Sequence, residues 1–546
     1  MKRFKHNIIL PAVALAFASF GMTACVGDLD VENINPKQVA TNNNDAMFNK
    51  IYANLVLTGT TGPDGNGDIE GLDEGMSNLL RQVWNANELT TDEAHCTWGD
   101  AGIPEYNNNK WTDTHPMMNA LYYRLFFGVT ISNYYLSEVQ GGDAETKAKR
   151  AEARFMRALY YYYLMDLYGN PPFLTVVSTA KAPQTTRAEL FKFITNELKD
   201  VVGDGSGDEL LKDPKTNTYG RADKAAGWML LARLYLNSEV YSGEAHYDLA
   251  KSYADKVIGS GYKLCDTPKG GYTPYQLLFM ADNNENGAQN EIILPAIHDG
   301  VRTQTWGGML FLIASTVNSD IATDYALGTT EGWSGNNPRH QFVLKFFPSD
   351  NAPIGTPTEV AAAANDDRAL FFTYIKDGDD KKARQSEIDT ESDFNEPYCY
   401  VKFTNVRSDA QPTADTRFVD TDFPLFRAAE AYLTYAEADA RLNGGTCTTD
   451  GVDKIKALRT RANAYNSLAS FSLNEILDEW SREFGFEGRR RTDLVRFGFF
   501  GGQSKYTWEW MGGTKEGLQF PAYRNIFAIP QSDITANGNL KQNEGY

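Results

Sequence analysis

Three tryptophans stand beside glycines in polar stretches of the sequence: Trp98, Trp306 and Trp333. Such a setting is typical of loops, and a large ring exposed on a loop needs an explanation. An exposed indole can stack on the apolar C–H face of a pyranose, while charged side chains hydrogen-bond the surrounding hydroxyls. The chemistry that these residues could do is therefore carbohydrate binding. The alternative for Trp98 is burial in the core.

The loop 62–75 allows two interpretations. Asp64, Asn66 and Asp68 alternate as the oxygen ligands of a calcium loop do, but Gly75 stands where a bidentate glutamate should close it. The same stretch could instead be a polar binding loop. We predict no cofactor, and calcium at this loop is the alternative.

Other metal chemistry has no signature in the sequence. The six histidines form no HExxH motif, and the cysteines after Cys25 are widely separated, without CxxC spacing. We predict no metal site. The pairing of Cys96, Cys265, Cys399 and Cys447 is left open by their spacing.

Charged residues alternate near the end of the chain: Glu483, Glu487, Arg489, Asp493 and Arg496. They are close enough in sequence to form charge-assisted hydrogen bonds that fasten the last helix to its neighbours. The alternative is a carboxylate pair for acid/base catalysis, but interleaved arginines keep carboxylates ionised instead of raising a pKa. We predict that the protein is not an enzyme.

Helical pairs must position these residues. Apolar residues recur at helical spacing in 151–168 and 190–201, and Thr186 with Glu189 forms a capping box before the second of these segments. Two pairs of amphipathic segments with short breaks follow, at 225–236 with 250–257 and at 424–442 with 451–464. Small residues on their contact faces follow the packing logic of tetratricopeptide repeats.

The sequence therefore predicts a mainly α fold, a tetratricopeptide-like helical repeat scaffold with a large loop-rich insertion carrying short strands. We expect the scaffold at about 40–260 and 421–500, and the loop-rich ligand-binding region at about 59–116 and 265–420. Trp228 lies on a helical apolar stripe, which predicts a core position.

The N-terminus is typical of a secretion signal. Residues 1–24 combine a basic start with an apolar stretch too short for a membrane span, and small residues precede Cys25. We predict cleavage before Cys25 and one domain over 25–546; an ordinary signal peptide is the alternative. The formal charge of −19 disfavours nucleic acid as a partner.

Several motifs together resemble the SusD/RagB family of nutrient-binding outer-membrane lipoproteins. The small residues before Cys25 resemble a lipobox, and Asp28, Asp30 and Glu32 resemble an acidic export tag. The helix beginning Phe426-Arg427-Ala428, the stretch Arg482–Arg496 and the closing residues 540–546 are similar to the family's most recognisable segments. Trp480 departs from the pattern, where a basic residue is usual.

The resemblance implies a site and partners. Trp98 would begin an aromatic arc, with Asp73, Arg81 and Asp100 hydrogen-bonding sugar hydroxyls, and Trp333 and Trp306 would form its other side. Cys25 would carry lipid and hold the protein at the outer membrane, on the cell surface. The protein would deliver a glycan, preferably starch or another α-glucan, to a TonB-dependent SusC-like transporter.

Other functions remain open from the sequence. A fructan-binding or peptide-binding member of the same family is one alternative. A secreted glycan-degrading enzyme is another, because a chain with so many carboxylates can bring two within 5–10 Å.

Overall fold

The computed structural model describes residues 43–349, 352–502 and 504–546. Cys25, the signal segment and the acidic tag therefore lie outside the described residues. The chain divides into two units, 1–46 and 47–546, and the second is described here by itself. In the described part, no helix combines the length and the apolar character needed to cross a bilayer.

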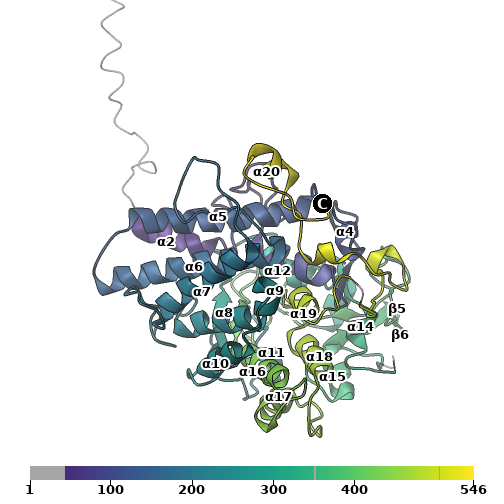
Figure 1. Cartoon of the computed structure of the whole chain (residues 1–546). Helices are drawn as coiled ribbons and strands as arrows, with labels where there is room; N and C mark the ends of the chain where they lie inside the picture. Colours follow the sequence, from purple (N-terminus) through teal and green to yellow (C-terminus); the bar gives the residue numbers. More distant parts are fainter. Residues whose placement is uncertain (1–42, 350–351, 503) are drawn as a thin grey trace, which may run out of the picture. The chain divides into compact units, whose positions relative to one another are not determined.

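Helices follow one another through the first half of this unit, and the long ones between residues 116 and 258 pack in succession (Figure 1). They are α2 (Asn44–Ala53), α5 (Pro116–Glu138), α6 (Ala144–Tyr168), α7 (Arg187–Val202), α8 (Lys224–Leu236), α9 (Ser238–Ser242) and α10 (Tyr247–Ile258). The stack continues from α10 to α16 (Ala428–Leu442), and α16 packs on α17 (Thr449–Arg461) and α18 (Leu473–Phe484). This arrangement confirms the predicted helical repeat scaffold.

Local signals in the sequence start and stop these helices. The hydroxyl of Thr186 accepts from the backbone N–H of Glu189, whose carboxylate accepts from the backbone N–H of Thr186 in return. Ser472 and Glu475 form the same capping box before α18. The contact alanines Ala225, Ala232 and Ala254 are fully buried, which lets α8 and α10 approach closely.

The predicted helix over 424–442 is wrong in its first turn. Residues Phe423–Arg427 form strand β8, which pairs antiparallel with β2 (Ile292–Ala296), and α16 begins only at Ala428. Pro424 lacks a backbone donor and the residue before a proline avoids helical geometry, so the chain stays extended here.

Short elements fill the loop-rich regions, as predicted. The strands pair two by two: β1 (Ala94–Cys96) with β3 (Asn336–Pro338), β4 (Phe371–Phe372) with β7 (Cys399–Tyr400), and β5 (Tyr374–Asp377) with β6 (Asp380–Ala383). The short helices are α4 (Ile103–Asn107), α11 (Pro274–Leu277), α12 (Gly308–Ala314), α13 (Ser319–Asp324), α14 (His340–Val343), α15 (Pro357–Ala364), α19 (Arg490–Arg496) and α20 (Gln531–Ala536). Single turns occur at Ala288–Asn290, Met511–Gly513 and Ala522–Asn525.

The region 59–116 is more regular than expected. Helix α3 (Leu79–Trp84) runs directly into the π-helix η1 (Asn85–Leu89), and both are almost wholly buried. Trp228 also differs from its predicted core position, since its ring is only half-buried.

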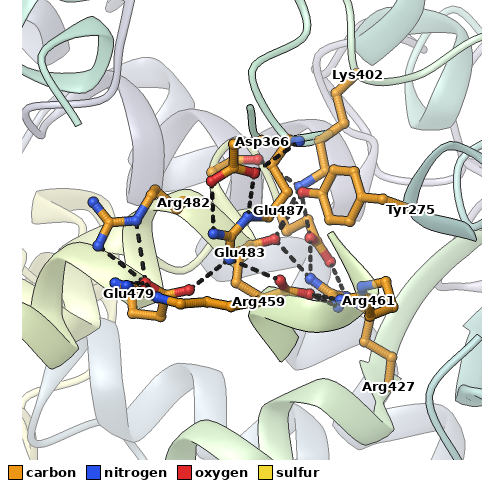
Figure 2. A network of polar contacts seen from close by, with 12 residues as sticks. Tyr275, Asp366, Lys402, Arg427, Arg459, Arg461, Glu479, Arg482, Glu483 and Glu487 are labelled. Carbon is orange, nitrogen blue, oxygen red and sulfur yellow. Dashed lines mark hydrogen bonds and ion pairs between the residues drawn. The ribbon is translucent and has the colours of Figure 1, made fainter. Parts of the chain in front are cut away.

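Buried charges join the C-terminal motif to the scaffold (Figure 2). Glu483 accepts from Arg427 at 2.6 Å and also from Arg461, and Glu487 accepts from Lys402 at 2.7 Å. Asp493 pairs with Arg489 and Arg496, and Arg496 also pairs with Glu437 on α16. The predicted fastening of the last helices by charge-assisted hydrogen bonds is confirmed.

The same network changes the acidity of its carboxyls. Burial alone would raise the pKa of Glu483, but Arg461, Arg427 and Arg368 lower it to about 2. Glu483 is therefore a fixed anion, unsuited to exchange a proton with a substrate at neutral pH.

Four cysteines lie in the described part of the chain. Cys96, Cys265, Cys399 and Cys447 are all buried, and none forms a disulfide. The pairing left open by the sequence is thus resolved as four free thiols.

Candidate functional site

The three loop tryptophans lie in one row. The ring centroids of Trp98 and Trp333 are 6.5 Å apart, and those of Trp333 and Trp306 are 6.3 Å apart. Each ring is partly exposed and packs against the core on its other side. The structure therefore brings together residues that are more than 230 positions apart in the sequence.

Successive rings in this tryptophan row, Trp98–Trp333–Trp306, are inclined to one another. The interplanar angle is 47° between Trp98 and Trp333 and 56° between Trp333 and Trp306. A flat ligand could not lie parallel to all three rings, so the row suits a ligand whose surface curves.

The pairing of β1 with β3 fixes one end of the row. Just beyond β1, the backbone N–H of Thr97 donates to the carbonyl of Gly335 at 2.9 Å, and the indole N–H of Trp98 donates to the carbonyl of Trp333 at 3.1 Å. A side chain at Gly335 would have its Cβ only 2.5 Å from the Trp98 ring. Glycine at this position lets the indole of Trp98 lie flat against the neighbouring loop.

Buried Glu74 fixes the other end. Its carboxylate accepts from the backbone N–H of Trp306 at 2.9 Å and from the hydroxyl of Thr58 at 2.6 Å. The loop 62–75 thus holds Trp306, which comes from a segment more than 200 residues away.

Arg81 lies beside the row, and its charge is not paired with any acidic side chain that the structure describes. Its guanidinium is 5.8 Å from the Trp98 ring and 4.8 Å from the Phe311 ring, and it forms no hydrogen bond or ion pair with any described residue. Burial lowers the pKa of Arg81, while Asp73, Asp100 and Glu74 act to raise it. Among the residues that the structure describes, Arg81 therefore pairs with none of the acids around it.

Asp73 and Asp100 flank this arginine on exposed turns. One oxygen of Asp73 accepts from the backbone N–H of Met76 at 2.7 Å, which orients the carboxylate. Both carboxylates act on Arg81 electrostatically. The six predicted residues, Asp73, Arg81, Trp98, Asp100, Trp306 and Trp333, therefore belong to one neighbourhood.

Two charged residues of this neighbourhood were missed from the sequence. Glu331 accepts from the indole N–H of Trp333 at 2.7 Å and from Arg417 at 2.6 Å. Arg417 in turn lies over the Trp306 ring, with its guanidinium carbon 4.4 Å from the ring centroid. Neither residue stands in a recognisable motif, and 86 positions separate them.

The carboxylate of Asp68 is already used within the protein. It accepts from Lys50 at 2.8 Å and from Arg124 at 2.7 Å, one cation on each oxygen. The contacts of Asp68 thus hold the loop 62–75 on the helices. In the described ranges, no three histidine, cysteine, aspartate or glutamate residues group as they would around a metal ion.

The arrangement can hold a hydroxyl-rich ring by two kinds of contact. The indole faces offer stacking surfaces, and the unpaired guanidinium with its flanking carboxylates offers donors and acceptors for hydroxyl groups. Carbohydrate recognition uses this combination.

Two family models match the chain. One, described as the SusD family, matches residues 271–546, and the other, described as starch-binding associating with outer membrane, matches residues 29–236. The starch-binding protein SusD of Bacteroides thetaiotaomicron is 41% identical, over 98% of each chain. A SusD-like protein of Bacteroides ovatus is 24% identical, over 77% of this chain and 70% of its own.

Solved structures share the fold. A SusD-like protein from Bacteroides fragilis gives a TM-score of 0.67 at 18% identity, over 92% of this chain and 96% of its own. Surface glycan-binding protein A from Bacteroides thetaiotaomicron, in complex with laminarihexaose, gives 0.63 at 18% identity, over 92% and 99%. The order of helices and the matches along the whole chain agree: this protein belongs to the SusD family.

Proposed function

We propose that this protein binds a glycan on the tryptophan row and that its preferred ligand is starch or another α-glucan. The observation that carries the proposal is the row itself, three partly exposed indoles in contact beside an unpaired guanidinium. The similarity to a starch-binding protein at 41% identity supports it.

The inclination of the rings favours an α-glucan. Chains of α-1,4-linked glucose coil, so successive sugar faces turn, whereas β-1,4-linked chains are extended and present a flatter ribbon. Successive indoles here are inclined by 47° and 56°, which matches a turning chain. A fructan or another polysaccharide is the runner-up, since a solved structure with this fold is described as a laminarin-binding SusD-like protein.

Each side chain has a distinct part in this proposal. Trp98, Trp333 and Trp306 stack on successive sugar rings, and Arg81 donates to hydroxyls between them. Asp73 and Asp100 accept from hydroxyls at the exposed edge. Because the row touches only one side of the sugar, we expect modest affinity.

The test is Trp98→Ala, with binding to soluble starch and maltoheptaose measured by calorimetry. Loss of one stacking platform should abolish detectable binding, because each ring contributes a large share of a weak interaction. Trp98 is partly buried, so a fall in melting temperature of a few degrees is expected, corresponding to about 1 kcal/mol of lost packing. Unaltered affinity would remove Trp98 from the site.

We further propose that the protein binds without catalysis. The carboxylates bonded to the row already have partners within the protein: Glu331 accepts from the indole N–H of Trp333 and from Arg417, and Glu74 accepts from the backbone N–H of Trp306. Incubation with starch should release no reducing ends above the buffer control. Clear turnover would favour the glycan-degrading enzyme instead.

The proposal also includes anchoring of the protein to the membrane and delivery of the glycan to a transporter. Cys25, outside the described residues, would carry lipid and hold the protein at the outer surface, where it passes glycan to a TonB-dependent transporter. The outer-membrane description of the matching family supports the location. Replacement of Cys25 by serine should move the protein from the membrane fraction to the soluble fraction; continued membrane retention would contradict lipidation at this residue.

A further inference from the structure

Residues of the helices α16 and α17 and of the segment 263–274, which leads into α11, line a second cleft. Its volume is about 610 Å³, within the range of small-molecule sites. It shares no lining residue with the tryptophan row. We name it the α17 cleft.

Two tyrosines line the α17 cleft from opposite chain segments. Tyr432 projects from α16, and Tyr272 lies on the loop before α11. Both rings are half-buried, and neither hydroxyl has a hydrogen-bond partner among the residues that the structure describes. Each ring therefore offers a stacking face together with an unused donor and acceptor.

The loop that carries Tyr272 is held in place. Backbone hydrogen bonds run in both directions between Lys269 and Tyr272, at 3.2 and 2.9 Å. Gly270 and Gly271 make the tight turn between them with φ angles of +62° and +86°, a conformation that favours glycine. The tyrosine is thus presented by a closed hairpin turn.

The floor of the α17 cleft is rigid as well. Arg461, at the end of α17, lines the cleft and donates to Glu291 at 2.8 Å and to Glu483. Figure 2 shows this arginine within the buried charge network. The two carboxylates neutralise the charge of Arg461. Arg461 therefore forms part of the cleft wall but attracts anions only weakly.

The α17 cleft is also lined by one positive and one negative side chain. Lys263 and Asp266 line the cleft and are exposed, and neither forms an ion pair with a described residue. Asp266 accepts only from the neighbouring hydroxyl of Thr267, at 3.0 Å. A strongly charged ligand would meet one repulsive group, whereas a neutral ligand with many hydroxyls could use both.

We infer that the α17 cleft is a second binding site, for a neutral saccharide of about one to three sugar units, independent of the tryptophan row. Two tyrosine faces separated by a pocket of this size suit a short sugar, and the unpaired groups suit its hydroxyls. Two sites on one chain would retain a polysaccharide longer than either alone, because a polymer bound at one site is concentrated at the other.

The test isolates the cleft in a protein whose tryptophan row is disabled by Trp98→Ala and Trp333→Ala. Saturation-transfer NMR with maltotriose, cellotriose and kestose should show contact with at least one sugar at millimolar concentration. Ala457→Arg, which adds bulk on the cleft face of α17 while keeping a strong helix former, should reduce this signal at least tenfold. Tyr272→Ala should do the same by removing a stacking face.

Tyr465→Ala is the matched control, since this tyrosine is 73% exposed, lies near α17 and does not line the cleft. It should leave the signal unchanged. No signal with any of the three sugars would overturn the inference, as would a signal that survives both Ala457→Arg and Tyr272→Ala. The outcome is separate from that of the tryptophan row, whose failure would appear as unaltered starch affinity after Trp98→Ala in the otherwise unmodified protein.

Discussion

Arg81 carries a charge that the described residues do not neutralise. Proteins seldom leave a guanidinium both partly buried and unpaired, because desolvation of the charge is costly without a partner. Its burial lowers its pKa, although Asp73 and Asp100 act in the opposite direction. A side chain kept at such a cost is explained if a ligand completes its hydrogen bonds.

Replacing Arg81 with methionine should therefore weaken glycan binding while leaving the fold intact. Hydrogen bonds to a charged group contribute about 1.5–3 kcal/mol, so the dissociation constant should rise roughly ten- to a hundredfold. The free energy of unfolding in urea should stay the same or increase. Arg81→Lys is the matched variant, which keeps the charge but loses the planar fork, and intermediate affinity is expected. Equal affinity of all three proteins would exclude Arg81 from the site.

The residues of the tryptophan row could be predicted from the sequence only in part. Glycines beside the three tryptophans indicated exposed rings, and family resemblance placed Trp98 at the start of the arc and added Asp73, Arg81 and Asp100. Arg417 and Glu331 had no such signal, because their role depends on two loops that meet only in three dimensions. Long-range loop contacts of this kind leave no periodic pattern in the chain.

The short β1–β3 pair holds Trp98 against the segment that contains Gly335. Gly335, next to β3, lies under the indole, and a methyl group there would come within 2.5 Å of the Trp98 ring. The ring would have to shift from its present position, and its hydrogen bond to the carbonyl of Trp333 would be disturbed. The geometry of the tryptophan row thus depends on a residue that no ligand needs to touch.

Gly335→Ala should consequently reduce glycan affinity about tenfold or more, with the ring of Trp98 displaced in a crystal structure. The physical cause is steric, since both ring and backbone are held by hydrogen bonds. Gly99→Ala is the matched control, because a Cβ at Gly99 would meet nothing within 4 Å. If both variants bind equally well, the close contact at Gly335 does not determine the site.

Elements with strong local signals were predictable. The capping box at Thr186 and the small-residue contact faces of α8 and α10 form as expected, and Ser472 begins α18 with a second capping box. The strand β8 was missed because its apolar residues match a helical stripe, and only its pairing with β2 shows the extended form. The burial of η1 was missed because its sequence is mostly polar, and the side-chain amides of Asn85 and Asn87 donate hydrogen bonds inside the protein.

At the scale of the molecule, buried charges connect distant parts of the chain. Glu483 receives hydrogen bonds from Arg427 on β8, Arg461 on α17 and Arg368 in the loop-rich region. These arginines lower the pKa of Glu483 to about 2 against the effect of burial. A carboxyl with a lowered pKa in the folded state stabilises the protein above its unfolded pKa of about 4.3 and loses this contribution as the pH falls toward 2.

Stability should therefore decline as the pH falls from about 5 to 2, in urea titrations followed by circular dichroism. Glu483→Gln should cost roughly 3–5 kcal/mol at pH 7, because it leaves several buried arginines without their anion. Glu516→Gln, at an exposed position, is the control and should change stability by less than about 0.5 kcal/mol. A Glu483→Gln protein as stable as the control at pH 7 would show that the network contributes little.

The four buried cysteines have a practical consequence. Burial raises the pKa of Cys96 and Cys447 to about 12 and that of Cys265 to about 11, so sulfhydryl reagents find neither access nor thiolate in the native state. A maleimide dye would then label these positions only in molecules that have opened. The rate of its incorporation at these four positions would then measure spontaneous unfolding, and a cysteine engineered onto the surface would be labelled ahead of these four thiols.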